Sequence, residues 1–232
     1  MSKCIAIIPA RGGSKRIPRK NVKLFLGKPI IVYSIEAALQ SGLFDEVMVS
    51  TEDEEIAQIA KRYGAQVPFM RSLKNADDYA TTFDVVKEVL SWYTSNENSF
   101  EWACCIYPCA PFVSASKLLQ AQAKLENFDS IFPVIRFSYP IQRALEFNQE
   151  NQKLDFSDSS YSASRSQDLK PAFHDAGQFY WMNTAKVLAE RKIITTNSTG
   201  IIVDEMEVQD IDTLADWHLA ELKYKLLNHV SN

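Results

Sequence analysis

The segment Ile8-Pro-Ala-Arg-Gly-Gly-Ser-Lys-Arg-Ile-Pro-Arg-Lys-Asn21 follows the first apolar run and surrounds two adjacent glycines with cations. The glycines are Gly12 and Gly13, and the cations are Arg11, Lys15, Arg16, Arg19 and Lys20. Glycines let a backbone approach a ligand closely and direct its N–H groups, while arginine and lysine bind phosphate oxygens. The loop follows a short strand, so it should lie beyond the carboxyl ends of an open α/β sheet, where such sheets bind ligands. The segment predicts a polyphosphate-binding loop.

Other interpretations of this loop stay open from the residues alone. Gly12, Gly13 and Lys15 do not fit the spacing of a Walker A loop, and the Gly-x-Gly-x-x-Gly dinucleotide pattern is absent. A basic cluster is also compatible with a solvated loop or with a nucleic-acid-binding patch.

Composition favours a dedicated anion site over non-specific binding. The 232-residue chain is 46% hydrophobic and 23% charged, which suits one domain, 1–232, with a real core. Its net charge of −4 and pI of about 5.5 argue against non-specific binding to nucleic acid or membranes. The basic loop is therefore a local feature of an acidic protein.

Several features predict a cytoplasmic protein. The sequence has no signal-peptide pattern and no apolar run long enough to span a bilayer. The four cysteines form neither a Cys-x-x-Cys pair nor a zinc-ligand arrangement with the histidines. We expect them to be reduced thiols.

Alternating patterns predict an α/β fold with a doubly wound, mostly parallel sheet. Strands are expected over 4–8, 46–50, 66–70, 102–107, 130–136 and 178–182. Helices are expected over 29–41, from a capping box Thr51-Glu-Asp-Glu54 to Gly64, and over 82–93, 116–127 and 212–227. The segment 137–175 is polar and aperiodic, which predicts a loop or an excursion that packs against something else.

Two segments follow predicted strands at the ligand-binding edge. Arg71 and Ala76-Asp-Asp-Tyr-Ala-Thr-Thr82 lead into a helix whose free N–H groups could hold a base or phosphate, although N-capping by Thr81 or Asp78 explains them equally well. Tyr107-Pro-Cys-Ala-Pro-Phe112 is a sharp turn that could also be a stiff connection.

The segment Gln209-Asp-Ile-Asp212 predicts a metal site. Its two carboxylates stand at alternate positions, so they share one face of an extended chain. Mg²⁺ typically takes one or two carboxylates together with substrate phosphates. The alternative is that Asp212 caps the last helix and Asp210 is solvated.

Three later segments mix amides, guanidinium groups and aromatic rings. They are Pro140-Ile-Gln-Arg143, Arg165-Ser-Gln-Asp-Leu169 and His174-Asp-Ala-Gly-Gln-Phe-Tyr-Trp181. These groups could bind a polar ligand with apolar faces, because arginine pairs with a carboxylate, amides bind acyl groups and aromatic rings pack on apolar surfaces. Residues of the core and of hinges would have a similar composition.

Residues 8–21 resemble the signature of the sugar-acid cytidylyltransferases, the family that contains the CMP-sialic acid synthetases, and the resemblance runs nearly end to end. It implies a Rossmann-like fold of the nucleotide-diphospho-sugar transferase type, CTP as substrate and Mg²⁺ as cofactor. The three later segments resemble pseudaminic acid cytidylyltransferases more than the neuraminic acid or KDO enzymes. Cys109 departs from the family's Pro-Thr-Ser-Pro turn, where threonine is more usual.

The resemblance implies a role for each candidate residue. The nucleotide contacts are Pro9, Ala10, Arg11, Gly12, Gly13, Asn21, Arg71, Ala80 and Thr82, whereas Asp78 positions its loop. The catalytic residues are Arg11, Lys15, Lys20, Asp210 and Asp212, with the last two as metal ligands. The sugar contacts are Tyr107, Gln142, Arg143, Arg165, Gln167, His174, Gln178 and Tyr180.

The implied reaction converts CTP and pseudaminic acid to CMP-pseudaminic acid and pyrophosphate. N-acetylneuraminic or legionaminic acid is the alternative acceptor, and a non-catalytic nucleotide-binding regulatory module is the alternative class. The resemblance also implies a homodimer in which 137–175 is the dimerisation arm.

Overall fold

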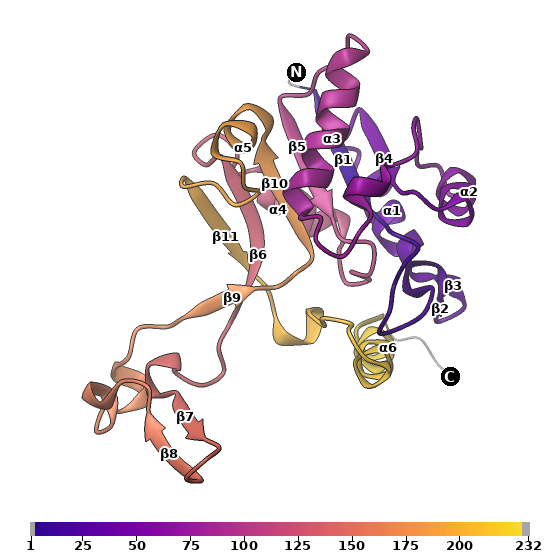
Figure 1. Ribbon diagram of the computed structural model, residues 1–232. Coiled ribbons are helices and arrows are strands. Elements are labelled where there is room, and N and C mark those ends of the chain that lie inside the picture. Colours follow the sequence, from indigo (N-terminus) through magenta and orange to yellow (C-terminus); the bar gives the residue numbers. More distant parts are fainter. Residues whose placement is uncertain (1–2, 229–232) are drawn as a thin grey trace.

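A seven-stranded, mostly parallel sheet forms the centre of the protein, seen in a computed structural model that describes residues 3–228 (Figure 1). The strand order is β11-β6-β10-β5-β1-β4, and β9 pairs with β6. The strands are β1 (Cys4–Pro9), β4 (Glu46–Ser50), β5 (Trp102–Ile106), β6 (Ser130–Arg136), β9 (Phe173–Asp175), β10 (Phe179–Asn183) and β11 (Ser198–Ile202). Only β9 and β10 of this sheet run antiparallel to their neighbours. The predicted fold class is confirmed.

Helices cover both faces of the sheet because β1 is apolar on both sides. Ala6 and Ile8 pack in one buried cluster, with residues of α1 (Ile30–Ser41), α2 (Glu54–Arg62) and α4 (Ala115–Gln122). Ile5 and Ile7 pack in the opposite cluster, with residues of α3 (Thr82–Ser95) and α5 (Thr184–Glu190). A strand buried on both faces is typical of parallel sheets.

A third buried cluster joins the basic loop to the end of the chain. Ile17 of the loop packs with Ile211 and with Trp217 of α6 (Leu214–Asn228). The two-stranded ribbon of β2 (Leu24–Phe25) and β3 (Lys28–Pro29) contributes Phe25. This cluster brings the segment around Asp212 next to the cationic loop.

Three local predictions are wrong. Residues 66–70 do not form a strand: Gln66 makes an isolated bridge with Met48, and Pro68 has no N–H to continue the ladder. The start of α2 is capped by Asp53, which accepts a hydrogen bond from the Ile56 N–H, and not by a capping box at Thr51. The helix expected over 116–127 ends at Gln122, and α5 and β11 were not anticipated.

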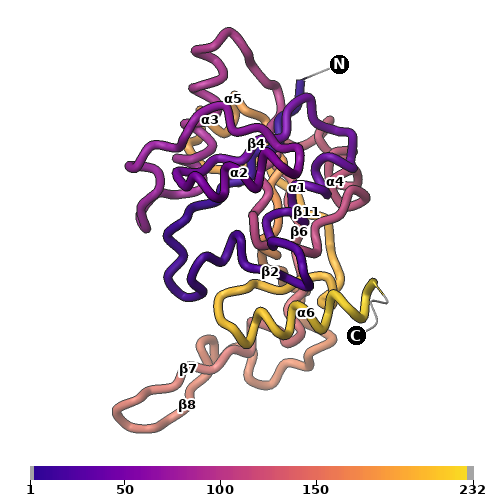
Figure 2. Tube along the Cα trace, turned by 90° about the vertical axis from the view of Figure 1, so that its right-hand side faces the viewer, coloured from indigo at the N-terminus to yellow at the C-terminus, as the bar shows by residue number. Residues whose placement is uncertain are grey.

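The predicted excursion leaves the body of the molecule (Figures 1 and 2). Its main element is a hairpin of β7 (Leu145–Asn148) and β8 (Lys153–Phe156), which lies apart from the central sheet in both views. The chain returns through β9, where Asp175 pairs with Val134. Within residues 3–228, no helix is both long and apolar enough to cross a membrane.

Candidate active site

A cavity of about 290 Å³ lies where the basic loop, the segment before α3 and the turn after β5 meet. Its walls include many of the candidate residues: Pro9, Arg11, Lys15, Lys20, Asn21, Arg71, Ala80, Thr82 and Tyr107. Its other charged and polar lining residues are Ser14, Arg16, Asn75, Asp77, Asp78 and Thr81. The predicted nucleotide contacts Ala10, Gly12 and Gly13 do not line it.

Asp78 holds two cations of the loop at the mouth of this cavity. Its Oδ1 accepts a hydrogen bond of 2.7 Å from Arg11 Nη1, and its Oδ2 accepts one from Lys15 Nζ. Hydrogen bonds from Lys15 and Arg11 lower the pKa of the Asp78 carboxyl, so it stays ionised. The Lys15 side chain is 78% exposed, so a polyphosphate in the cavity could reach it.

Gly12 of the glycine pair lies against two acids that follow β4. The Gly12 N–H donates to Glu52 Oε1 at 2.7 Å, and a Cβ placed on Gly12 would lie 2.5 Å from Asp53 Oδ2. Only glycine fits this close approach. Asp53 also accepts hydrogen bonds from both Nη atoms of Arg19, which raise the pKa of that guanidinium, and Glu55 pairs with it too.

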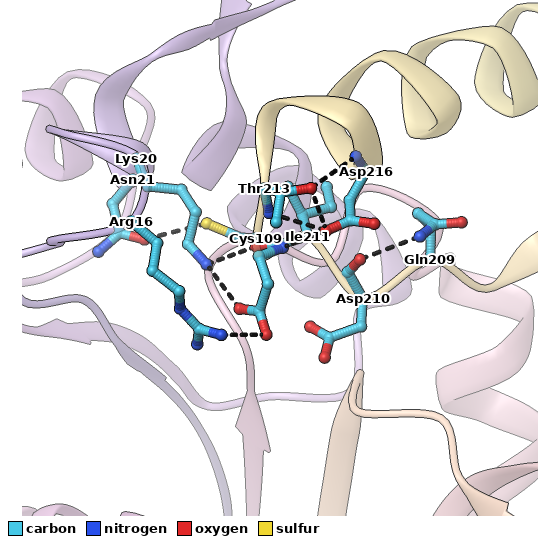
Figure 3. A network of polar contacts seen from close by, with 10 residues as sticks. Arg16, Lys20, Asn21, Cys109, Gln209, Asp210, Ile211, Thr213 and Asp216 are labelled. Carbon is cyan, nitrogen blue, oxygen red and sulfur yellow. Dashed lines mark hydrogen bonds and ion pairs between the residues drawn. The ribbon is translucent and has the colours of Figure 1, made fainter. Parts of the chain in front are cut away.

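Asn21 links the loop to the turn after β5. It is 5% exposed, and its Nδ2 donates to the Arg11 carbonyl at 2.8 Å. Its Oδ1 lies 3.1 Å from Cys109 Sγ, the donor (Figure 3). Burial raises the pKa of the Cys109 thiol to about 12, so the thiol is a neutral donor at physiological pH.

Arg71 and Thr82 form the opposite wall. Arg71 is 6% exposed, its Nε donates to Ser50 Oγ at 2.9 Å, and burial lowers the pKa of its guanidinium. Thr82 opens α3, and its Oγ1 lies 3.1 Å from the Tyr107 hydroxyl. The N-cap is Thr81, which forms a capping box with Asp84. Thr82 is therefore not needed as a cap.

The Asp212 carboxylate faces the basic loop. Its Oδ2 accepts a hydrogen bond of 2.6 Å from Arg16 Nη1, and its Oδ1 lies 3.8 Å from Lys20 Nζ. Lys20 also donates to the Ile211 carbonyl at 2.6 Å, whereas Asp210 is exposed (Figure 3). The structure brings Asp212 to the cations of the basic loop, whereas Asp210 makes no ion pair with them and neither carboxylate lines the cavity.

The alternative role of Asp212 as a helix cap is wrong. Thr213 and Asp216 cap α6 reciprocally: the Thr213 N–H donates to Asp216 Oδ2 at 2.7 Å, and the Asp216 N–H donates to Thr213 Oγ1 at 3.2 Å. Asp212 is thus left to face Arg16 and Lys20.

The donor set fits a metal that also binds substrate oxygens. No group of three or more His, Cys, Asp or Glu side chains able to hold a metal ion occurs between residues 3 and 228. Two carboxylates beside a cationic cavity match Mg²⁺, which keeps few protein ligands and takes phosphate oxygens as well. They do not match the closed sites typical of zinc.

The predicted sugar contacts divide into two groups, and the first lies in the body of the molecule. Tyr107 lines the cavity and its ring lies 5.3 Å from that of Tyr180. Tyr180 is 3% exposed and its hydroxyl donates to Asp175 Oδ2 at 2.6 Å. Gln178 is also 3% exposed, and its Nε2 donates to the Glu207 carbonyl at 2.7 Å.

The second group lies on the excursion and does not line the cavity of its own chain: Gln142, Arg143, Arg165, Gln167 and His174. Gln142 Nε2 donates to the Lys170 carbonyl at 3.0 Å. Arg165 Nε donates to Asp168 Oδ2 at 2.7 Å. The ring of His174 packs 4.9 Å from that of Phe137, at the base of the excursion.

Comparison with known proteins decides the family. Residues 5–214 match the model of the cytidylyltransferase family. The chain belongs to this family. It is 46% identical to a pseudaminic acid cytidylyltransferase of Campylobacter jejuni, and the match covers 99% of each chain. It is also 32% identical to a CMP-N,N'-diacetyllegionaminic acid synthase of Legionella pneumophila, covering 94% of each.

Solved structures agree on the fold of this cytidylyltransferase. CMP:2-keto-3-deoxy-manno-octonic acid synthetase, solved in complex with CTP, superposes with a TM-score of 0.66 at 18% identity, covering 99% of this chain and 100% of that one. The 4-diphosphocytidyl-2C-methyl-D-erythritol synthase of Anaerococcus prevotii has a TM-score of 0.64 at 13% identity, with coverages of 97% and 99%. The family resemblance and the assignment as a nucleotidyltransferase are confirmed. Cytidylyltransferases of this kind are generally metal-dependent.

Two acids of the cytidylyltransferase site were missed by sequence reasoning. Glu52 and Asp53 were considered only as parts of a helix start, although both contact Gly12. The available signal was their position directly after a predicted strand, since neighbouring parallel strands end at the same edge. Their position after a strand places Glu52 and Asp53 beside the basic loop only if β4 is known to lie next to β1 in the sheet.

Proposed function

We propose that this cytidylyltransferase transfers CMP from CTP to pseudaminic acid and releases pyrophosphate. One observation carries the proposal: the basic loop and the start of α3 converge on one cavity in a chain that is 46% identical to a pseudaminic acid cytidylyltransferase over its whole length. The cavity supplies the cations that a triphosphate needs, and the identity supports the choice of acceptor.

In the proposed reaction the anomeric hydroxyl oxygen of the sugar acid attacks the α-phosphorus of CTP. The bond from that phosphorus to the bridging oxygen breaks, pyrophosphate leaves with the electron pair, and the hydroxyl proton passes to solvent. Arg11, Lys15 and Lys20 neutralise the triphosphate, because a charge that spreads over phosphate oxygens is stabilised by fixed cations. Arg11 and Lys15 exchange Asp78 for phosphate oxygens when CTP binds.

Asp210 and Asp212 would hold Mg²⁺, and Gly12, Gly13 and Asn21 would shape the loop around the phosphates. Mg²⁺ supplies charge neutralisation at the phosphates and lowers the pKa of the acceptor hydroxyl. Arg16 and Lys20 contact Asp212, and in the proposed reaction they would bind phosphate oxygens and leave the carboxylate to the metal. Arg71, Ala80 and Thr82 are proposed contacts of the nucleoside.

A homodimer would complete the sugar site. The excursion carries Gln142, Arg143, Arg165 and Gln167 away from the cavity of its own chain, so we propose that they reach the cavity of a second copy. The hairpin supports this role because its cross-strand pairs Leu145–Phe156 and Phe147–Leu154 share one face. Leu145, Phe147 and Leu154 are each more than half exposed, as an unpartnered interface would be.

We propose the cytoplasm as the compartment of this reaction. Cys4, Cys104 and Cys105 are buried, and Cys104, Cys105 and Cys109 are free thiols, which suits a reducing environment.

The test is pyrophosphate release from CTP with Mg²⁺, with pseudaminic, legionaminic and N-acetylneuraminic acids offered separately. EDTA and an Asp212→Ala variant serve as controls. Turnover with pseudaminic acid that both controls abolish is the expected result. Turnover only with another acid would overturn the assignment of pseudaminic acid as acceptor. No pyrophosphate release with any of the three acids, despite CTP binding, would favour a regulatory module.

A further inference from the structure

The chain that carries Asp210 and Asp212 has no regular secondary structure to hold it. Residues 203–213 connect β11 to α6, and their only element is a single 3-10 turn over Glu205–Glu207. Side chains that bind metal at useful affinity must be held close to their final geometry. The positions of the two carboxylates must therefore be fixed by contacts from elsewhere.

Side chains from other elements bind the carbonyl groups of this segment. Lys223 Nζ donates to Glu205 O at 3.1 Å and to Val208 O at 2.8 Å. Gln178 Nε2 donates to Glu207 O at 2.7 Å, and Lys20 Nζ donates to Ile211 O at 2.6 Å. Each side-chain donor thus satisfies a backbone carbonyl group that in a β-sheet would accept a hydrogen bond from a neighbouring strand.

Lys117 is the least expected of the groups behind this segment. It is the third residue of α4, where a cation is disfavoured by the helix dipole, and its side chain is only 10% exposed. Its Nζ donates to the Phe112 carbonyl at 3.1 Å and lies 3.3 Å from Glu207 Oε1. One buried cation thus joins the turn after β5 to the segment that leads to Asp210.

Gln178 makes the same connection from the other side. Its own carbonyl accepts the Tyr107 N–H at 2.8 Å, while its amide holds Glu207. The Nε2 atom of Gln178 is committed to this backbone contact, and Gln178 is 3% exposed and does not line the cavity.

We infer that Lys117 and Gln178 are positioning residues that act through Glu207 and fix the segment that carries Asp210 and Asp212, so that Asp212 faces the basic loop. The inference rests on the proposed function, in which the two aspartates bind the metal. Neither residue touches substrate or metal. Both connect the segment that carries Asp210 and Asp212 to the turn that contains Tyr107 and Cys109. The turn that lines the cavity and the two carboxylates are therefore held in a fixed relation to each other.

The variants Lys117→Met and Gln178→Met test the inference, because each keeps the length of the side chain and removes the donor. The control is Lys28→Met: Lys28 is also partly buried, pairs with Glu36 and lies over the ring of Tyr33, but it lies in the β2–β3 ribbon. Three quantities are measured for each variant: Mn²⁺ affinity in the presence of CTP by electron paramagnetic resonance, CTP affinity in EDTA by calorimetry, and melting temperature.

We expect Lys117→Met and Gln178→Met to weaken Mn²⁺ binding about 10-fold, the low end for groups that orient metal ligands, with CTP affinity in EDTA changed less than about two-fold. Lys28→Met should lower the melting temperature without changing Mn²⁺ affinity. Unchanged Mn²⁺ affinity in Gln178→Met and in any folded Lys117→Met would overturn the inference and leave the proposed reaction intact. Unchanged Mn²⁺ affinity in Asp212→Asn would instead overturn the assignment of the metal ligands, and the inference with it.

Discussion

Lys15 illustrates how a cation can matter for turnover without mattering for stability. Its ion pair with Asp78 lies at the surface, where solvent screens the attraction, so the pair contributes little to folding. A charge-assisted hydrogen bond to phosphate is worth about 1.5–3 kcal/mol. We therefore expect Lys15→Ala to lower kcat/KM by about 10- to 100-fold while shifting the melting temperature by about 4 °C or less. Lys61→Ala, at an exposed site on α2, is the control, and parallel losses of activity and stability in Lys15→Ala would contradict the role.

The buried thiols make the folding stability of the protein decrease at alkaline pH. Burial raises the pKa of Cys105 to about 12 from the value of 9.0 for an exposed thiol. Above pH 9 the unfolded chain loses this proton while the folded chain keeps it, so stability is complete below pH 9 and falls as pH rises toward 12. The loss should be about 1 kcal/mol per pH unit for this group. Urea unfolding between pH 8 and 10.5 should therefore show a shallower alkaline decline for Cys105→Ala than for the wild type, whereas equal slopes would contradict the assignment.

At the scale of elements, the basic loop is shaped by the two acids after β4. Alanine at position 12 would place its Cβ 2.5 Å from Asp53 Oδ2, whereas a Cβ at Gly13 would meet nothing within 4 Å. Overpacking of this kind typically costs about 1–3 kcal/mol. We expect Gly12→Ala to lower the free energy of unfolding by about that amount and Gly13→Ala to change it little. Equal melting curves for the two variants would show that Asp53 does not confine the loop.

The elements that were predicted correctly are those with a strong local signal. The apolar runs at 4–8 and 130–136 and the Gly42 stop of α1 lie within the sequence itself. The strand predicted over 66–70 was wrong because Val67 and Phe69 favour a strand, whereas Pro68 has no N–H to continue the hydrogen-bond ladder with β4. The contacts of Glu52 with Gly12 and of Asp212 with Arg16 depend on strand order and on the cluster around Ile17, which no local pattern encodes.

At the scale of the whole molecule, the hairpin of β7 and β8 needs a partner. An isolated two-stranded hairpin is marginally stable in water, and this one turns Leu145, Phe147 and Leu154 to solvent. We expect sedimentation to show a dimer for the wild type and a monomer for the double variant Phe147→Glu/Leu154→Glu. Glu146→Lys, on the opposite face of β7, should remain dimeric. A wild-type monomer at assay concentration would remove the proposed shared site.

Phosphorus NMR of one reaction mixture examines nucleotidyl transfer itself. CTP, Mg²⁺ and pseudaminic acid are incubated with the enzyme, and the fate of each phosphate is followed. Attack at the α-phosphorus predicts that the three CTP resonances are replaced by pyrophosphate and one phosphodiester resonance of a CMP-sugar, in equal amounts. CDP together with a sugar phosphate, or CDP together with orthophosphate, would contradict the proposed chemistry of the site.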